Sequence, residues 1–175
     1  MTTERVKIIS ILLMFFWGAA VKAHDGQVNI SGTIQDNTCE LAPDSQNKMV
    51  DMGIVAGAQF SQTGDFTPVK RFILNLQNCG PAASGARVMF SGIADAQNNK
   101  LFAIETGEGA ASGIALGIYD DSGNIIKPGD MSGATTLKPG QTSAALSFMA
   151  NYVAKQNTVT PGAANVTVTF SVNYD

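Results

Sequence analysis

Residues with side chains suited to catalysis or metal binding are scarce in this sequence. Among its 175 residues, His24 is the only histidine, and Cys39 and Cys79 are the only cysteines. Asp120 and Asp121 form an adjacent acidic pair in a turn-like context. Such a pair supplies neither a metal ligand set nor the two separated carboxyl groups of a glycosidase. We therefore expect no metal site and no catalytic acid pair.

A glycine-rich stretch is the other candidate for ligand chemistry. Gly107, Gly109 and Gly113 have spacing that resembles a phosphate-binding loop, but the surrounding sequence lacks the strand-to-helix context that such a loop requires. Serine and threonine are plentiful, yet none stands in a motif with a base that would activate it as a nucleophile. The sequence therefore predicts that the protein is not an enzyme and uses no cofactor.

The first 23 residues have the pattern of a secretory signal peptide. Arg5 and Lys7 precede an apolar run over residues 8–20, and small residues then form a cleavage site. The run is shorter than the ~20 apolar residues that a membrane-spanning helix needs. We predict cleavage after Ala23, with cleavage after Ala20 as the alternative, and export of a chain that has no membrane span.

Export determines how the histidine and the cysteines are interpreted. Cleavage makes His24 the first residue of the exported chain, and a histidine at a mobile terminus cannot act as a positioned general base. Two cysteines in an exported chain are most simply joined in one disulfide, Cys39–Cys79. Closing a loop of about 40 residues stabilises a fold by roughly 3–4 kcal/mol in the chain-entropy model. A metal pair is the alternative, and it lacks further ligands.

The exported chain is acidic and has the length of one domain. Residues 24–175 carry 8 basic and 13 acidic side chains, which gives a net charge of −5. The basic residues stand singly apart from Lys70 and Arg71, whereas a nucleic-acid surface needs a clustered basic stripe. We therefore expect no nucleic-acid partner. A length of 152 residues fits a single domain.

The elements that position these residues are expected to be strands. Residues 26–35 and 162–175 alternate between apolar and polar side chains with a two-residue period, as in a half-buried strand. Shorter strands are expected around residues 49–54, 72–76, 88–90, 101–104, 114–118 and 144–152. Turn residues separate these runs, and no long window keeps the apolar stripe of a helix. The pattern predicts an all-β sandwich.

An ordered series of motifs resembles the subunits of type 1-like pili that are assembled by the chaperone–usher pathway. After the signal peptide, V-N-I-S-G-T-I precedes D-N-T-C at Cys39, and V-D-M-G follows at residues 50–53. The longer motifs are T-P-V-x-x-F-x-L-x-L-x-x-C-G at 67–80, F-S-G-I-A-D at 90–95 and A-A-S-G-I-A-L-G-I at 110–118. Gly162 stands fourteenth from the end and Tyr174 second from the end.

The resemblance implies the pilin fold, an incomplete immunoglobulin-like sandwich that lacks its last strand. Residues 1–23 would be the signal peptide, residues 24–36 an N-terminal donor-strand extension and residues 37–175 the pilin domain. The subunit would assemble by donor-strand exchange, in which its extension fills the groove of a neighbouring subunit. Its own groove would accept a strand of a periplasmic chaperone and then, at the outer-membrane usher, the extension of the next subunit.

The resemblance also assigns site residues by position. The donor residues would be Val28, Ile30, Gly32 and Ile34. The groove and chaperone-binding strand would present Gly162, Val166, Val168, Phe170, Val172 and Tyr174. The protein would then be a structural subunit of an adhesive fimbrium on the bacterial surface, exported through the periplasm. Residues 67–80 and 110–118 resemble a minor adaptor subunit more than a rod subunit.

Periodicity alone does not show whether residues 26–35 pair within their own chain or with a neighbour. In the first case the chain would be a free-standing periplasmic or extracellular immunoglobulin-like binding domain that completes its own sandwich. A tip adhesin is a further alternative, and such adhesins carry a lectin domain before the pilin domain. Cys39 comes only 16 residues after the predicted cleavage point, which leaves no room for a lectin domain.

Overall fold

The computed structural model describes residues 30–34 and 36–175. From Asp36 onward the described residues belong to one compact unit, and residues 30–34 lie outside it. The signal peptide expected over residues 1–23 and the donor residue Val28 lie outside the described residues, so both assignments stay predictions. No helix within the described ranges is long and apolar enough to cross a membrane.

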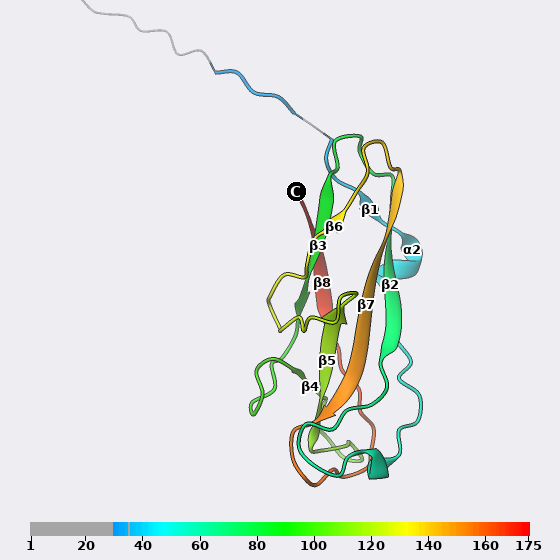
Figure 1. The fold of residues 1–175 in the computed structure, drawn as a ribbon, viewed down its shortest axis with the longest axis vertical. Coiled ribbons are helices and arrows are strands. Elements are labelled where there is room, and N and C mark those ends of the chain that lie inside the picture. The colour runs from blue at the N-terminus through cyan, green and yellow to red at the C-terminus, as the bar shows by residue number, and fades with distance from the viewer. Residues whose placement is uncertain (1–29, 35) are drawn as a thin grey trace, which may run out of the picture. The chain divides into compact units, whose positions relative to one another are not determined.

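The compact unit is built from two antiparallel β-sheets (Figure 1). The first sheet has the strand order β1-β2-β7-β5-β4, and the second has the order β6-β3-β8. The strands are β1 (Glu40–Leu41), β2 (Lys70–Gln77), β3 (Gly85–Ser91), β4 (Phe102–Ala103), β5 (Ile114–Asp120), β6 (Thr135–Thr136), β7 (Ser143–Ala154) and β8 (Thr169–Tyr174). The predicted all-β architecture is therefore confirmed.

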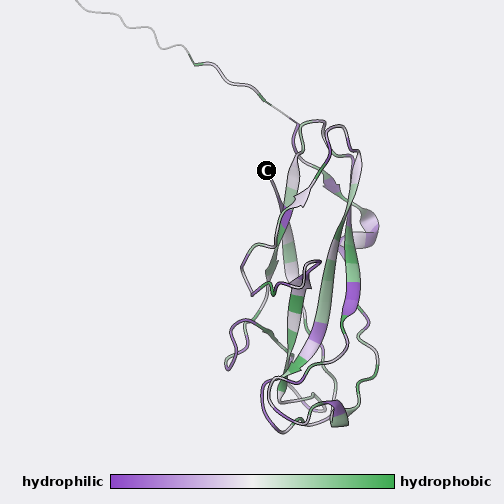
Figure 2. Cartoon of the chain, viewed as in Figure 1, coloured by the Kyte–Doolittle hydropathy of each residue, from purple (hydrophilic) through white to green (hydrophobic). Residues whose placement is uncertain are grey.

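The strands form where the sequence alternates, because one side of each strand faces the other sheet. Along β2, Leu74 and Leu76 are buried while Ile73 is exposed. On the neighbouring β7, Leu146 lies opposite Leu74 and is buried too. Figure 2 shows the resulting mixture of hydrophobic and hydrophilic residues along the strands.

Residues 30–34, expected to lie in a strand, join no ladder, and two segments of the compact unit also differ from the sequence-based expectation. The strand expected around residues 49–54 is absent, because this segment joins no ladder in the described chain. Its backbone turns at Gly53, which has a φ of +72° and donates its N–H to the side chain of Asp51; this local bond competes with strand pairing. Residues 42–48, where no regular element is expected, contain the short helix α2 (Pro43–Gln46), which starts with the proline favoured at that position.

The core divides into two hydrophobic clusters. The larger one joins both sheets, and its centre is a group of aromatic rings: Phe90 of β3 meets Phe148 of β7 edge to face with 5.0 Å between ring centroids. The smaller one surrounds Tyr152, and the 3-10 turn η1 (Gly57–Gln59) ends beside it at Phe60. Val166, just before β8, packs against both clusters.

The strand order has a gap when it is compared with a complete immunoglobulin sandwich. In the constant-type fold the strands form the sheets A-B-E-D and C-F-G. Taken in chain order, β1-β2-β7-β5 corresponds to the first sheet, and β3-β8 corresponds to strands C and F of the second. No described residue forms the last strand, whose place is beside β8. The fold is thus an immunoglobulin-like sandwich without its final strand.

Candidate functional site

The site begins with the unpaired edge of β8. This strand pairs with β3 along one edge, from Ala86↔Tyr174 to Ser91↔Thr169. Within residues 36–175 no strand pairs with its other edge. The N–H and C=O groups on an unpaired edge are ready to bond another strand. We call this edge, with the apolar side chains of the C-terminal segment, the β8 edge.

The apolar face of the β8 edge is only half covered. Its side chains pack against the core yet stay partly exposed, and they are Val166, Val168, Phe170, Val172 and Tyr174. The polar residues between them are exposed. The alternation continues through residues 166–168, before the ladder of β8 begins at Thr169.

Comparison with the neighbouring strand β3 shows how incompletely the apolar face of β8 is covered. Val88 and Phe90 of β3 lie opposite Val172 and Phe170 on the same sheet. The β3 members of these pairs are 0% and 3% exposed, whereas the β8 members are only partly buried. Both members of each pair face the same interior, so the difference comes from missing cover on the β8 side.

The C-terminal end of β8 is tied to the disulfide. Cys39, just before β1, and Cys79, just after β2, are bonded to each other. The hydroxyl of Tyr174 donates a hydrogen bond to the C=O of Cys39 over 2.9 Å. Burial raises the pKa of Tyr174 above its ordinary value. The backbone of Asp175 continues the contact by donating to the C=O of Gly85.

Gly162 marks the other end of the C-terminal segment, where two stretches of backbone cross. A Cβ atom at this position would lie 2.5 Å from the carbonyl carbon of Ala110 and 2.6 Å from the C=O oxygen of Gly109. The neighbouring Ala163 exchanges two backbone hydrogen bonds of 2.8 Å with residues 109 and 111. Only a residue without a Cβ fits this crossing.

The predicted donor residues that the structure describes, Ile30, Gly32 and Ile34, lie outside the compact unit. Ile30 and Ile34 are both exposed, with 92% of the Ile30 surface accessible. Gly32 has no neighbouring heavy atom within 4 Å of where a Cβ would stand. The structure thus brings the β8 residues onto one face and joins the cysteines, but it does not place the described donor residues in a site.

One buried ion pair was missed by the sequence analysis. The carboxylate of Asp95 accepts a 2.5 Å hydrogen bond from Lys155 and two more from the backbone N–H groups of Gln97 and Asn98. Burial raises the pKa of Asp95, but these hydrogen bonds outweigh it, so the pKa is lowered overall. The D-x-Q-N sequence signals a turn around Asp95, but nothing signals Lys155, 60 residues away.

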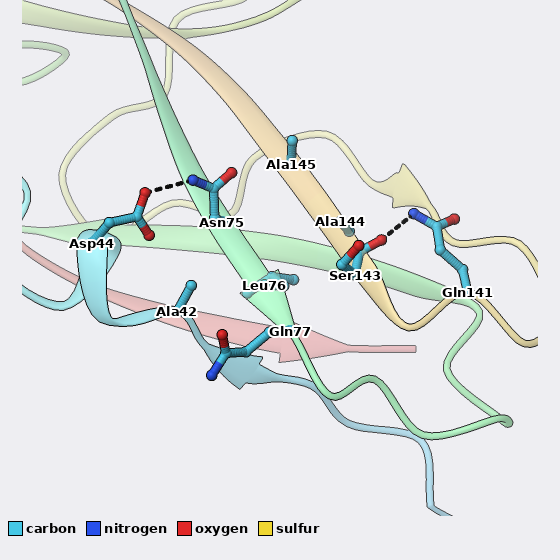
Figure 3. A pocket seen from close by; sticks show the side chains of 9 residues that line it. All are labelled: Ala42, Asp44, Asn75, Leu76, Gln77, Gln141, Ser143, Ala144 and Ala145. Carbon is cyan, nitrogen blue, oxygen red and sulfur yellow. Dashed lines mark hydrogen bonds between the residues drawn. The ribbon is translucent and has the colours of Figure 1, made fainter.

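Two shallow pockets lie along β2 rather than at the β8 edge. One is about 520 Å³ and is lined by residues of α2, β2 and β7. Its polar groups largely bond to each other: Asn75 donates to Asp44, and Gln141 donates to the C=O of Ser143 (Figure 3). The other, about 330 Å³, lies further along β2. In the described part of the chain, no group of three or more His, Cys, Asp or Glu residues could hold a metal.

Comparison with known proteins agrees with this geometry. The sequence model of the family described as "Fimbrial protein" matches residues 28–175. An Escherichia coli protein, the uncharacterized fimbrial-like protein YcbV, is 40% identical over 98% of this chain and 99% of its own length. The probable major fimbrial subunit LpfA of another Escherichia coli strain is 38% identical over 89% of this chain and 87% of its own length.

A solved structure shares the fold at lower sequence identity. A subunit from the structure of a chaperone–usher pilus superposes with a TM-score of 0.65 and 19% identity. The match covers 90% of this chain and 99% of that one.

Proposed function

The chain belongs to the fimbrial protein family and is a subunit of a bacterial surface fimbrium, and we propose that it polymerises by donor-strand exchange. The β8 edge first receives a strand from a periplasmic chaperone. At the outer-membrane usher, residues 26–35 of the next subunit replace that strand. As in its family, the role of the protein is structural rather than enzymatic.

The observation that carries this proposal is the unequal burial of the facing pairs between β3 and β8. Val88 is fully buried, while its partner Val172 is only partly covered although it faces the same interior. A strand laid along the β8 edge would cover that face and bond the unpaired backbone groups at the same time.

The extension has the pattern that such a strand needs. Ile30 and Ile34 are apolar, stand on the same side of a two-residue period and are exposed in the isolated chain. Each Val or Ile side chain that becomes fully buried contributes roughly 1.5–3 kcal/mol. Two to three such residues therefore supply a substantial part of the stability of a single domain.

Gly32 interrupts the row of large donor side chains. A glycine inside a strand often marks a point where another backbone or a bulky side chain approaches closely. We place Gly32 against the bulkiest part of the receiving face, near Phe170 of the neighbouring subunit. A Cβ at this point would keep the donor strand away from the β8 edge.

Export and position in the pilus follow from the same proposal. The signal peptide over residues 1–23 directs the chain to the periplasm, and the assembled fimbrium supports cell adhesion. The relatives include a probable major fimbrial subunit, so assignment as a minor adaptor rather than as a rod subunit stays a prediction. A free-standing binding domain is not favoured, because such a domain would leave the half-covered β8 face without a role.

A displacement experiment tests the proposal. A labelled peptide of residues 26–35 is added to the chaperone-bound subunit, and the complexes are separated by gel filtration. We expect the peptide to replace the chaperone and to elute with the subunit. The control peptide carries Ile30→Asp and Ile34→Asp and should stay free. Failure of both peptides, or equal binding by both, would reject donor-strand exchange.

A further inference from the structure

The two edges of β2 differ in how they are covered. One edge pairs with β7 from Lys70↔Ala150 to Gln77↔Ser143. The other pairs with β1 at its end and is then capped at Asn75. There the N–H of Ala42 donates to the C=O of Asn75, and the N–H of Asn75 donates to the Ser45 hydroxyl. Ser45 belongs to helix α2, and this helix lies beside β2, where Asp44 points toward Asn75 (Figure 3).

Beyond this cap the edge of β2 is open. Backbone groups of successive strand residues point to alternate edges, so those of Ile73 and Arg71 point the same way as those of Asn75. No described residue donates to, or accepts from, the backbone of Ile73 or Arg71 on this edge. We call this stretch the β2 edge.

A shallow groove lies beside the β2 edge. Residues 48–51 run next to the strand without pairing with it, and the space between them is about 330 Å³. The groove is lined by Lys48, Met49, Val50, Asp51, Lys70, Arg71, Phe72 and Ile73. Met49 and Ile73 expose 91% and 41% of their surfaces here. The groove therefore combines unpaired backbone with accessible apolar side chains.

The groove is basic although the protein is acidic. Three of the 8 basic residues in residues 24–175 line it, Lys48, Lys70 and Arg71, against the single acid Asp51. Asp51 accepts the N–H of Gly53 and keeps its charge, so the lining carries three positive charges against one negative charge. Arg71 contacts Asp121 at 2.9 Å, but both side chains are mostly exposed, and exposed pairs of this kind hold weakly.

We propose that the β2 edge is a docking site for an extended acidic peptide segment of a partner protein. The segment adds to the edge at Arg71 and Ile73 through backbone hydrogen bonds. Its apolar side chains cover Met49 and Ile73, and its carboxylates meet Lys48 and Lys70. This site is separate from the β8 edge and does not depend on donor-strand exchange.

Lysines on an edge strand also have a protective role, since they discourage pairing with other strands. The two roles give different results when the lysines are neutralised to glutamine, because glutamate would keep a charge on the edge and still discourage strand pairing. If the lysines only protect the edge, replacing them weakens no binding and promotes self-association. If they recognise carboxylates, replacing them weakens the binding of an acidic peptide.

Fluorescence anisotropy of a labelled peptide, Asp-Val-Glu-Val-Asp, against the chaperone-bound subunit tests the site. We expect this peptide to bind and its counterpart Lys-Val-Lys-Val-Lys not to bind.

The double variant Lys48→Glu/Lys70→Glu should weaken binding by about tenfold or more, because it opposes the peptide charge at both contacts. If the charge reversal disturbs folding, the milder double variant Lys48→Gln/Lys70→Gln replaces it and should also weaken binding of the acidic peptide. Lys100→Glu/Lys138→Glu, two exposed lysines outside the groove, should leave binding unchanged.

Two further measurements distinguish strand addition at the β2 edge from simple charge attraction and from binding at the β8 edge. Methylating the alternate backbone nitrogens of the peptide should abolish binding, since strand addition needs those N–H groups. Unlabelled peptide 26–35 should not displace the acidic peptide. Equal binding of acidic and basic peptides, no binding at all, displacement by peptide 26–35, or an unaffected lysine variant would each overturn the proposal.

Discussion

At the scale of single residues, backbone crowding explains why a glycine stands at position 162, and a hydrogen bond explains why a tyrosine stands at position 174. In the sequence, Gly162 and Tyr174 stand out only by their distance from the C-terminus. The structure gives each a physical reason, because Gly162 lies at a crossing of two backbone segments and Tyr174 bonds the carbonyl next to the disulfide. Neither reason is visible in the sequence, since each partner is more than 50 residues away.

Replacing Gly162 by alanine should destabilise the subunit by about 1–3 kcal/mol, in the range of overpacking in a filled interior. The added Cβ would meet backbone atoms of residues 109–111, which cannot move aside like a flexible side chain. Urea unfolding measures the loss. Gly107→Ala is the matched control, because a Cβ there has no atom within 4 Å, and it should change stability by less than about 0.5 kcal/mol.

Tyr174 should make the subunit sensitive to alkaline pH. Burial raises the pKa of Tyr174 in the folded state, so the unfolded chain loses the phenolic proton first. Its contribution to stability is therefore complete below the ordinary tyrosine pKa of 10.0 and is lost as the pH rises through the folded value. Between pH 10.0 and the raised folded pKa, the fall of unfolding free energy with pH should be shallower for Tyr174→Phe. An unchanged slope would mean that Tyr174 is as solvated in the folded state as in the unfolded one.

At the scale of elements, the sequence predicts a strand correctly wherever a run of alternating apolar and polar residues pairs with another strand of the same chain. The runs at 72–76, 88–90, 114–118 and 144–152 all lie in ladders, since both their backbone and their apolar face find partners in the domain. The strand prediction for the run at 49–54 is wrong, because the Asp51 side chain bonds the Gly53 backbone and turns the chain. The short helix α2 escapes prediction, since four residues are too few to show a helical period.

The two faces of β8 should respond differently to charge. Val172→Asp would place a carboxylate on the half-covered apolar face, and it should abolish binding of peptide 26–35 in the displacement experiment. Ser171→Asp puts the same charge on the adjacent exposed position, and binding should stay within about twofold of the unmodified subunit. Circular dichroism shows whether both variants fold. Equal loss in both would indicate a general charge effect rather than contact with the apolar face.

At the scale of the whole molecule, the sequence could indicate an unfinished sandwich only through its resemblance to pilus subunits. Alternation at 162–175 predicts an apolar face, but it does not show what covers that face. The strand order supplies the missing information, because the position beside β8 is empty in the described chain while the remaining strands follow the immunoglobulin order. The basic groove beside the β2 edge could not be predicted, since only folding brings Lys48 into the same groove as Lys70 and Arg71.

The most direct test of an open β8 edge compares two forms of residues 24–175 that are exported without a chaperone. One form ends at Asp175, and the other carries a second copy of residues 26–35 after Asp175, joined by a short flexible turn. A third form, with Ile30→Asp and Ile34→Asp in the added copy only, controls for the extra length. Soluble yield, gel filtration and thermal melting are measured for all three.

We expect only the form with the unmodified second copy to be a soluble monomer, and we expect it to melt tens of degrees above the other two. The added strand buries two isoleucines and pairs the free backbone of β8. If all three forms are monomeric and melt alike, the sandwich is already complete, and donor-strand exchange is contradicted.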